Sequence, residues 1–128
     1  MVAALKRVHQ IAQHADDLDR AVAFYRDTLG LAFIARFDPP GLAFFDLGNT
    51  RLLLETAAAS VVVYFEVDDI DANYRSLAAA GVEIVAEPHS IHRDEAGDFG
   101  PVGGEEWMTF FRDSEQNLLA LVERRAPA

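Results

Sequence analysis

The stretch HADDLD at residues 14–19, continued by RAVAFYRDTLGL at residues 20–31, decides how this chain folds. A weaker copy, EVDDID, occurs at residues 66–71, and its aspartate Asp69 lies 52 residues after Asp17. Each copy is preceded by an extended apolar run and followed by residues with helical spacing. Because the pattern occurs twice and not many times, it predicts a duplicated supersecondary unit rather than a solenoid.

The residues after each copy predict an amphipathic helix. In the first copy, apolar residues from Leu18 to Leu29 recur on one face of a 3.6-residue period. We expect Asp16 or Asp17 to accept a hydrogen bond from the first turn, and Gly30 to end the helix. In the second copy the corresponding residues are Asp68 or Asp69 at the start, Ile70, Tyr74 and Leu77 on the apolar face, and Gly81 at the end.

Strand patterns surround both helices, so each half is expected to have the order β-α-β-β-β. The halves correspond to module one at 1–57 and module two at 60–126 of a single domain, 1–128. Loop 94–104 is glycine-rich and long for a hairpin connection. The predicted strands are 8–15, 31–37, 42–47, 51–56, 61–67, 83–91, 106–112 and 117–123, with turns at 39–41, 48–49 and 113–116.

Composition excludes several classes of function. The chain has 128 residues, 51% of them apolar and 25% charged, which is typical of one globular domain. A net charge of −10 argues against nucleic acid or an anionic membrane as the main partner. No apolar run approaches the roughly 20 residues that cross a bilayer. The absence of cysteine excludes disulfides, thiolate zinc sites and thiol nucleophiles. We therefore expect a cytoplasmic protein.

Three stretches together resemble the vicinal oxygen chelate superfamily. They are DLDRAVAFYRDTLGL at residues 17–31, FEVDDID at residues 65–71 and FFRDSEQNLL at residues 110–119. This superfamily includes glyoxalase I, methylmalonyl-CoA epimerase, extradiol dioxygenases, and fosfomycin and bleomycin resistance proteins. The resemblance implies an α+β, glyoxalase-like fold, in which two βαβββ modules form an open, barrel-like curved sheet around a concave cavity. The motifs are structural and do not select a reaction.

The resemblance also implies where a metal ion would bind. Catalytic members hold one divalent ion through side chains from four strands, and the ion activates neighbouring substrate oxygens. The matching positions are Gln10, Val62, Ala120 and, depending on the register of the fourth strand, Leu53 or Leu52. Only Gln10 can coordinate a metal ion, whereas a protein metal site needs at least three ligands as a rule. We therefore expect no metal ion and no other cofactor.

A metal site with relocated ligands stays open as an alternative. His9, His14 and Glu55 are its candidate ligands. His9 alternates with Gln10 across a strand and so points to the other face, while His14 lies about 13 Å from Gln10 along it. A divalent ion is expected only if such a relocation has occurred.

Further candidates flank the loop at 94–104. His92 before the loop and Glu106 after it are, with His14, candidate catalytic residues for acid–base chemistry. Trp107 either lines a pocket rim or packs half-buried, and the hydroxyl of Tyr64 either reaches a ligand or only packs. The expected cavity-lining residues are Gln10, Leu53, Val62, Tyr64, Trp107 and Ala120.

Two functions are compatible with these features. The first is a protein of the glyoxalase, bleomycin resistance and dioxygenase superfamily that lacks the family metal site and binds a small apolar or amphipathic molecule. The alternative is a glyoxalase- or epimerase-type lyase or isomerase, with relocated ligands or metal-free acid–base catalysis. In either case we expect a homodimer, because the exposed strand edges of an open half-barrel need covering.

Overall fold

The computed structural model describes residues 3–28, 30–57, 61–112 and 117–127. These residues form two compact units, which are described one at a time. The first unit comprises residues 9–62, and the second joins residues 63–128 to the segment that ends at Val8. The predicted turn at 113–116 and the helix residue Leu29 lie outside the described residues. The module boundaries at 1–57 and 60–126 stay a prediction.

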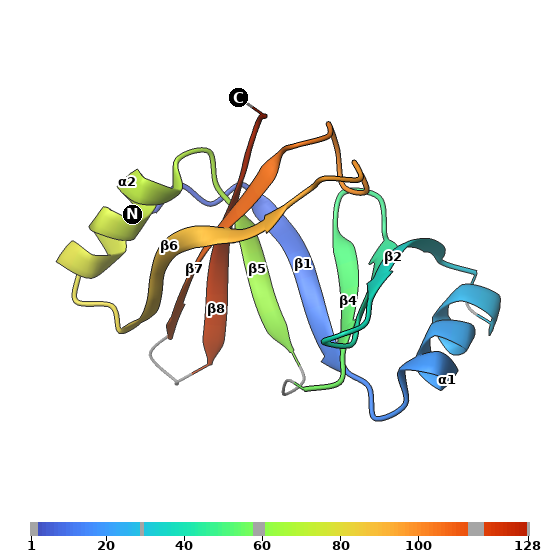
Figure 1. Ribbon diagram of the computed structural model, residues 1–128. Helices are drawn as coiled ribbons and strands as arrows, with labels where there is room; N and C mark the ends of the chain where they lie inside the picture. The colour runs from blue at the N-terminus through green and yellow to red at the C-terminus, as the bar shows by residue number, and fades with distance from the viewer. Residues whose placement is uncertain (1–2, 29, 58–60, 113–116, 128) are drawn as a thin grey trace. The chain divides into compact units, whose positions relative to one another are not determined.

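The first unit is a four-stranded sheet with one helix. Its strands have the order β2-β3-β4-β1, in which β1 and β4 are parallel and the other pairs are antiparallel. Helix α1 contacts β3 and β4. Figure 1 shows α1 on the same side as the labelled strands β2 and β4. The elements are β1 Arg7–His14, α1 Leu18–Ala23, the π-helix η1 Phe24–Thr28, β2 Ala32–Phe37, β3 Leu42–Asp46 and β4 Arg51–Glu55.

The aspartate repeat begins helix α1 as the sequence predicts. Of the two candidates, Asp17 is the cap, because its carboxylate accepts a hydrogen bond of 3.1 Å from the backbone N–H of Arg20. The expectation of one continuous α-helix to the end of the segment was wrong: η1 has the wider π form. Within this wider turn, the Tyr25 ring packs 6.0 Å from the ring of Phe45. Gly30 then adopts a positive φ of 74°.

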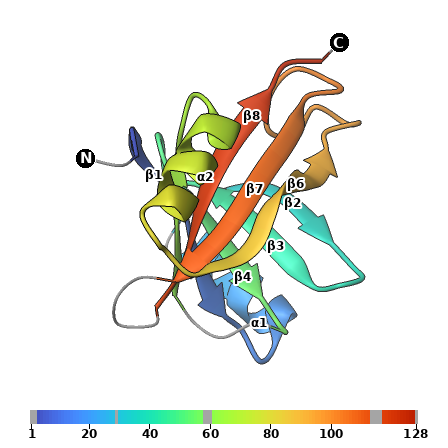
Figure 2. The same cartoon turned by 90° about the vertical axis from the view of Figure 1, so that its left-hand side faces the viewer.

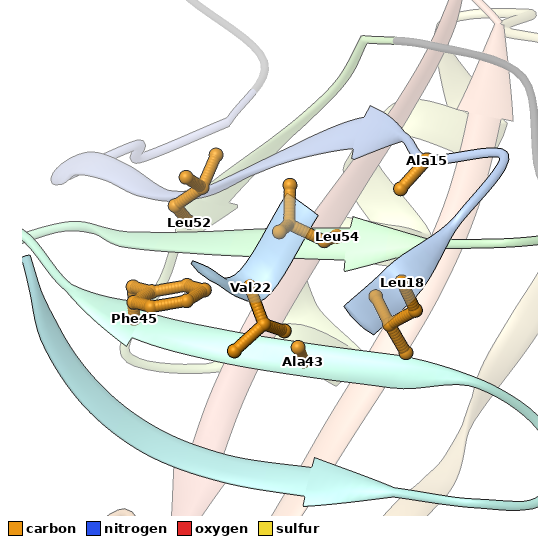
Figure 3. Packing of buried hydrophobic residues seen from close by; sticks show 7 residues of the cluster. All are labelled: Ala15, Leu18, Val22, Ala43, Phe45, Leu52 and Leu54. Carbon is orange, nitrogen blue, oxygen red and sulfur yellow. The ribbon is translucent and has the colours of Figure 1, made fainter. Parts of the chain in front are cut away.

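Residues from α1, β3 and β4 form the core of the first unit on the helix side of the sheet. Strand residues contribute to this core at every second position, because side chains alternate between the two faces of a strand. On β4 the contributors are Leu52 and Leu54, and on β3 they are Ala43 and Phe45. The complete cluster, shown in Figure 3, consists of Ala15, Leu18, Val22, Ala43, Phe45, Leu52 and Leu54.

The second unit repeats the plan of the first. Its strands have the order β5-β8-β7-β6, with β5 and β8 parallel and the other pairs antiparallel. Helix α2 contacts β6, β7 and β8, and Figure 2 shows it alongside β7 and β8. The carboxylate of Asp69 caps α2 by accepting from Ala72 N–H at 3.0 Å. The elements are β5 Val62–Glu66, α2 Ile70–Ala79, β6 Ile84–Arg93, β7 Glu105–Arg112 and β8 Leu118–Arg125.

The core of the second unit again lies between helix and sheet. Its buried members are Val67, Ile70, Leu77, Phe111 and Leu121. Backbone hydrogen bonds attach the N-terminal segment to this unit: Lys6 N–H donates to the Glu66 carbonyl, and Ala4 N–H donates to the Asn73 side chain. The Lys6 side chain also donates to the Asp68 carboxylate at 3.0 Å. The two βαβββ units confirm the predicted α+β, glyoxalase-like fold class. No helix among the described residues is long and apolar enough to cross a membrane.

Candidate functional site

Each sheet has one face that its own helix does not cover, which we call the helix-free face. In the first unit this face carries Arg51, Leu53 and Glu55 from β4, because Leu52 and Leu54 lie in the cluster under α1. The structure thereby decides between the two leucines that the resemblance left open. Leu53 is the one on the helix-free face, and Ala12 is its partner in the β1–β4 register.

A buried glutamine and an arginine meet on the helix-free face of the first unit. Gln10 is only 1% exposed, and its side-chain oxygen accepts a hydrogen bond from Nε of Arg51. The Arg51 guanidinium carbon also lies 5.2 Å from the centre of the Phe44 ring, within the range of a cation–π contact. The edge-on ring of Phe37 is 5.8 Å from the Phe44 ring. The Gln10 oxygen and the Phe44 ring therefore both contact the Arg51 guanidinium on this face.

His14 and Glu55 are opposite each other in the β1–β4 register, further along the same sheet. Burial raises the pKa of the Glu55 carboxyl above its ordinary value of 4.5. The His14 ring lies 2.7 Å from the Asp16 carboxylate, and this hydrogen bond lowers the pKa of Asp16. The candidate catalytic residue His14 is thus the register partner of Glu55, whose carboxyl retains its proton more readily than an ordinary glutamate does.

The helix-free face of the second unit is apolar at its centre. Tyr64 and Ala120 are partners in the β5–β8 register, and Phe110 is opposite Ala120 on β7. The Tyr64 and Phe110 rings meet edge to face with their centres 6.2 Å apart. Val62 begins β5 two residues before Tyr64 and is buried like it. Four side chains that cannot coordinate a metal ion strongly therefore line the face where two family ligand positions fall.

One end of the second sheet holds a buried charge network that sequence reasoning missed. Asp94 is 1% exposed, and its carboxylate accepts hydrogen bonds from the backbone N–H groups of Asp98 and Phe99 at 2.8 and 2.9 Å. Nη2 of Arg124 donates to the same carboxylate at 3.0 Å. Burial favours a raised pKa, but the two backbone donors and Arg124 outweigh it, so the pKa of Asp94 is lowered.

Two predicted catalytic residues adjoin this network. His92 and Glu106 are opposite each other in the β6–β7 register. Glu106 is 3% exposed, and its carboxylate lies 3.9 Å from Nη1 of Arg124. The His92 ring meets the Phe99 ring, on the loop that Asp94 organises, at 5.9 Å. In the sequence, the signal for this network is an aspartate at the start of the glycine-rich loop.

Trp107 does not lie on the helix-free face. It packs against the core cluster under α2, because it alternates on β7 with Glu106 and Met108. Its register partner is Glu123, and the Arg125 guanidinium stacks 4.0 Å from the centre of its ring. The reading of Trp107 as a residue of the pocket rim is therefore corrected, and the packing alternative holds.

A groove in the second unit lies away from these residues. It has a volume of about 380 Å³ and runs along the first turns of α2. Its lining includes none of the candidate site residues from the sequence. The lining residues are Ala3, Ala4, Asp68, Asp69, Ala72, Asn73 and Ser76.

The four positions that match the family's metal ligands do not fit a divalent ion. Leu53, Val62 and Ala120 have no donor atom, and the donor oxygen of Gln10 is bonded to the cationic guanidinium of Arg51. In residues 3–28, 30–57, 61–112 and 117–127, no three His, Asp or Glu side chains cluster closely enough to hold a metal ion. That the chain takes no cofactor at all stays a prediction.

Comparisons with known proteins agree with the fold. The chain is 28% identical to the uncharacterized protein YraH of Bacillus subtilis (strain 168), over 88% of this chain and 94% of that protein. The hypothetical protein BH1468 of Bacillus halodurans C-125 superposes with a TM-score of 0.72 at 16% identity, covering 95% of this chain and 96% of that one.

An enzyme structure has the same fold. A methylmalonyl-CoA epimerase variant of Streptomyces coelicolor, in complex with 2-nitronate-propionyl-CoA, superposes with a TM-score of 0.72 at 22% identity, covering 94% of this chain and 98% of that one. At this identity the likeness concerns the fold alone. The model of the Glyoxalase/Bleomycin resistance protein/Dioxygenase superfamily matches residues 7–121. The chain therefore belongs to the glyoxalase/bleomycin resistance protein/dioxygenase superfamily.

Proposed function

We propose that this protein binds a small apolar or amphipathic molecule on its helix-free faces and does so without the divalent metal ion of the family's enzymes. The proposal is supported by the chemistry of the side chains at the four positions that match the family's metal ligands. Three of them are hydrocarbons, and the fourth, Gln10, is engaged by Arg51. Aromatic and aliphatic side chains with a few placed polar groups are the usual lining of small-molecule sites.

Metal content is the test of this proposal. The protein is purified after expression with added zinc, nickel and manganese, and its metal content is measured by elemental analysis. We expect well below one metal ion per chain. A stoichiometric divalent ion that is lost on chelation, together with a catalytic activity, would overturn the proposal. The variant Gln10→Leu is the matched control, because an adventitious ion bound elsewhere on the acidic surface remains when this donor is removed.

Acid–base catalysis is the second candidate function, and Glu55 is the observation that favours it. A carboxyl whose pKa is raised by burial is suited to proton transfer, and His14 lies opposite it in the register. Because a structural relative is a methylmalonyl-CoA epimerase, methylmalonyl-CoA is the first substrate to test. Metal-free catalysis would exchange the hydrogen beside the thioester carbonyl.

Proton exchange in D₂O, followed by NMR, tests this second candidate. Exchange that Glu55→Gln abolishes and that a chelator leaves intact would establish it. The control is Glu83→Gln, because Glu83 is an exposed carboxylate paired with Arg112 in the second unit. If neither variant differs from a wild type that does not exchange the proton, epimerase-type chemistry is excluded for this substrate.

We also propose that the chain is a homodimer. Among the described residues, the outer strands β2 and β6 each have one edge without a partner strand in the strand order. Phe33 on β2 and Val85 and Ile91 on β6 are exposed apolar side chains at these edges. Light scattering at micromolar concentration should give twice the chain mass, and a monomeric mass would remove this proposal. The variant Val85→Lys should weaken a dimer that uses the edge of β6.

A cytoplasmic location, expected from composition, stays a prediction.

A further inference from the structure

The helix-free face of the first unit ends at a carboxyl group that has no partner among the described residues. This group belongs to Glu55, the last residue of β4, whose side chain is half-buried. Burial alone raises its pKa: within residues 3–28, 30–57, 61–112 and 117–127, no hydrogen bond and no neighbouring charge acts on this carboxyl. Glu55 therefore bears the cost of burying a polar group without the interaction that usually compensates for it.

The basic side chains on the same face do not neutralise Glu55. His14 is its register partner on β1, but Nε2 of His14 lies 2.7 Å from the Asp16 carboxylate, which engages it. Arg51 also lies on this face of β4. Four residues separate it from Glu55, which is about 13 Å at roughly 3.3 Å per residue. The carboxylate of Glu55 is thus available to a cation from outside the protein.

Apolar side chains extend across the sheet from Glu55. Leu42 on β3 is its register partner, and Phe37 on β2 is in turn the partner of Leu42. Residues directly opposite each other on antiparallel strands point to the same face. Phe37, Leu42 and Glu55 are all partly exposed, whereas Phe44 and Leu53, further along this face, are buried. A solute can therefore reach an apolar row that ends at a carboxylate.

An ammonium group is the ligand chemistry that fits the end of this row. It supplies N–H donors and the opposite charge, so it would form a charge-assisted hydrogen bond with the carboxylate. A hydroxyl supplies a donor without the charge, and an acidic ligand would be repelled. The net charge of −10 attracts cations to the whole surface, so an effect of Glu55 has to be separated from the overall field.

We infer that Glu55 selects an amphipathic amine as the ligand of this protein, with the ammonium group against the Glu55 carboxylate and the apolar body along Leu42 and Phe37. The inference rests on the proposed function and deepens it, because it names the ligand class. In this role Glu55 binds the ligand and transfers no proton.

Two fluorescent probes that differ in one functional group test the inference. The probe 1-pyrenemethylamine carries an ammonium group at neutral pH, and 1-pyrenemethanol has the same rings with a neutral hydroxyl. Their Kd values are measured at about 0.15 M salt, where charges further away than about 8 Å are largely screened. Wild type should bind both and prefer the amine. Glu55→Gln should raise the Kd of the amine by about tenfold and leave that of the alcohol within about twofold.

Two further variants separate the local charge from the overall field. Asp27→Asn is the matched control, because it removes one negative charge from the same unit at an exposed aspartate paired with Arg26. It should leave both Kd values unchanged. Glu55→Asp keeps the charge on a shorter side chain and should bind the amine better than Glu55→Gln does. The inference is overturned if Glu55→Gln weakens the amine no more than Asp27→Asn does.

Thermal unfolding separates a binding role from a structural one. Glu55→Gln removes a charge without a partner, so its Tm in the absence of ligand should equal or exceed that of wild type. A lower Tm, or a variant that does not fold, would assign Glu55 to the stability of the fold and overturn the inference. The amine should raise the Tm of wild type and of Asp27→Asn more than that of Glu55→Gln, because a ligand stabilises the state that binds it.

The remaining outcomes distinguish the inference from the proposed function. If wild type binds the two probes equally or prefers the alcohol, the inference fails while small-molecule binding stands. If wild type binds neither probe, both fail. Competition on wild type is an independent measurement, because 1-naphthylmethylamine should displace the pyrene amine better than 1-naphthalenemethanol or 1-naphthoate. Equal displacement by the amine and the alcohol would contradict the selection of an ammonium group.

Discussion

Replacing Asp94 by asparagine tests whether the buried network stabilises the second unit. The substitution keeps the shape of the side chain and removes its charge, while Arg124 remains in place. Removing one partner of a buried ion pair costs about 3–5 kcal/mol. Arg124 is 22% exposed, and the amide oxygen can still accept from a backbone N–H of the loop, so the cost is reduced. We expect Asp94→Asn to lower the free energy of unfolding by about 2–3 kcal/mol.

Urea denaturation at neutral pH measures this change. The matched control is Glu95→Gln, because Glu95 is the next residue and its ion pair with Arg93 is exposed. This control should change the free energy of unfolding by less than about 0.5 kcal/mol. An Asp94→Asn protein as stable as the control would refute the stabilising role of the network. A double-mutant cycle with Arg124→Met then measures the coupling between the two side chains.

The effect of Asp94 should also depend on pH in a fixed direction. Its pKa in the folded protein is lowered from the ordinary value of 3.8, so the folded state favours the carboxylate. The stabilisation is therefore fully present above about pH 4 and is lost as the pH falls below 3.8 through the folded-state pKa. The difference between wild type and Asp94→Asn should shrink over that window, and a difference that grows on acidification would contradict the assignment.

Three shorter predictions concern the loop, the helix cap and the family metal positions. Gly104→Ala should destabilise the protein by about 1–3 kcal/mol in thermal or urea unfolding, because the new Cβ would lie 2.5 Å from Nη2 of Arg124, which could move away only by giving up its hydrogen bond to the buried Asp94. Asp69→Ala should cost about 1 kcal/mol by removing the α2 cap, whereas Asp68→Ala, which removes no cap, should have little effect in the same assay. The third concerns Leu53→Glu, Val62→His and Ala120→Glu, made one at a time. Each should lower the free energy of unfolding by about 1–3 kcal/mol in urea, because it places a polar group without a partner at a buried apolar position.

Local patterns in the sequence were sufficient to predict where the helix of each unit begins and ends. The aspartate repeat predicts both helix starts, because a short acidic side chain satisfies free amides of the first turn, and Asp17 and Asp69 do so in the structure. Glycine at 30 and 81 marks both helix ends, where φ is positive. These features depend on residues that are neighbours in the chain, which is why sequence reasoning can find them.

Which side chains belong to the candidate site depends on strand register and on contacts between residues far apart in the chain. The sequence could not distinguish Leu52 from Leu53, because a shift of one residue exchanges the two faces of a strand. The sequence also left open whether Trp107 lines a pocket or packs in the core, because the strand register decides which face of β7 it lies on. Sequence reasoning singled out neither Arg51 nor Asp94, because their partners Gln10 and Arg124 are 41 and 30 residues away in the chain. Only the pairing of β1 with β4, and of the loop after β6 with β8, gives these side chains their electrostatic surroundings.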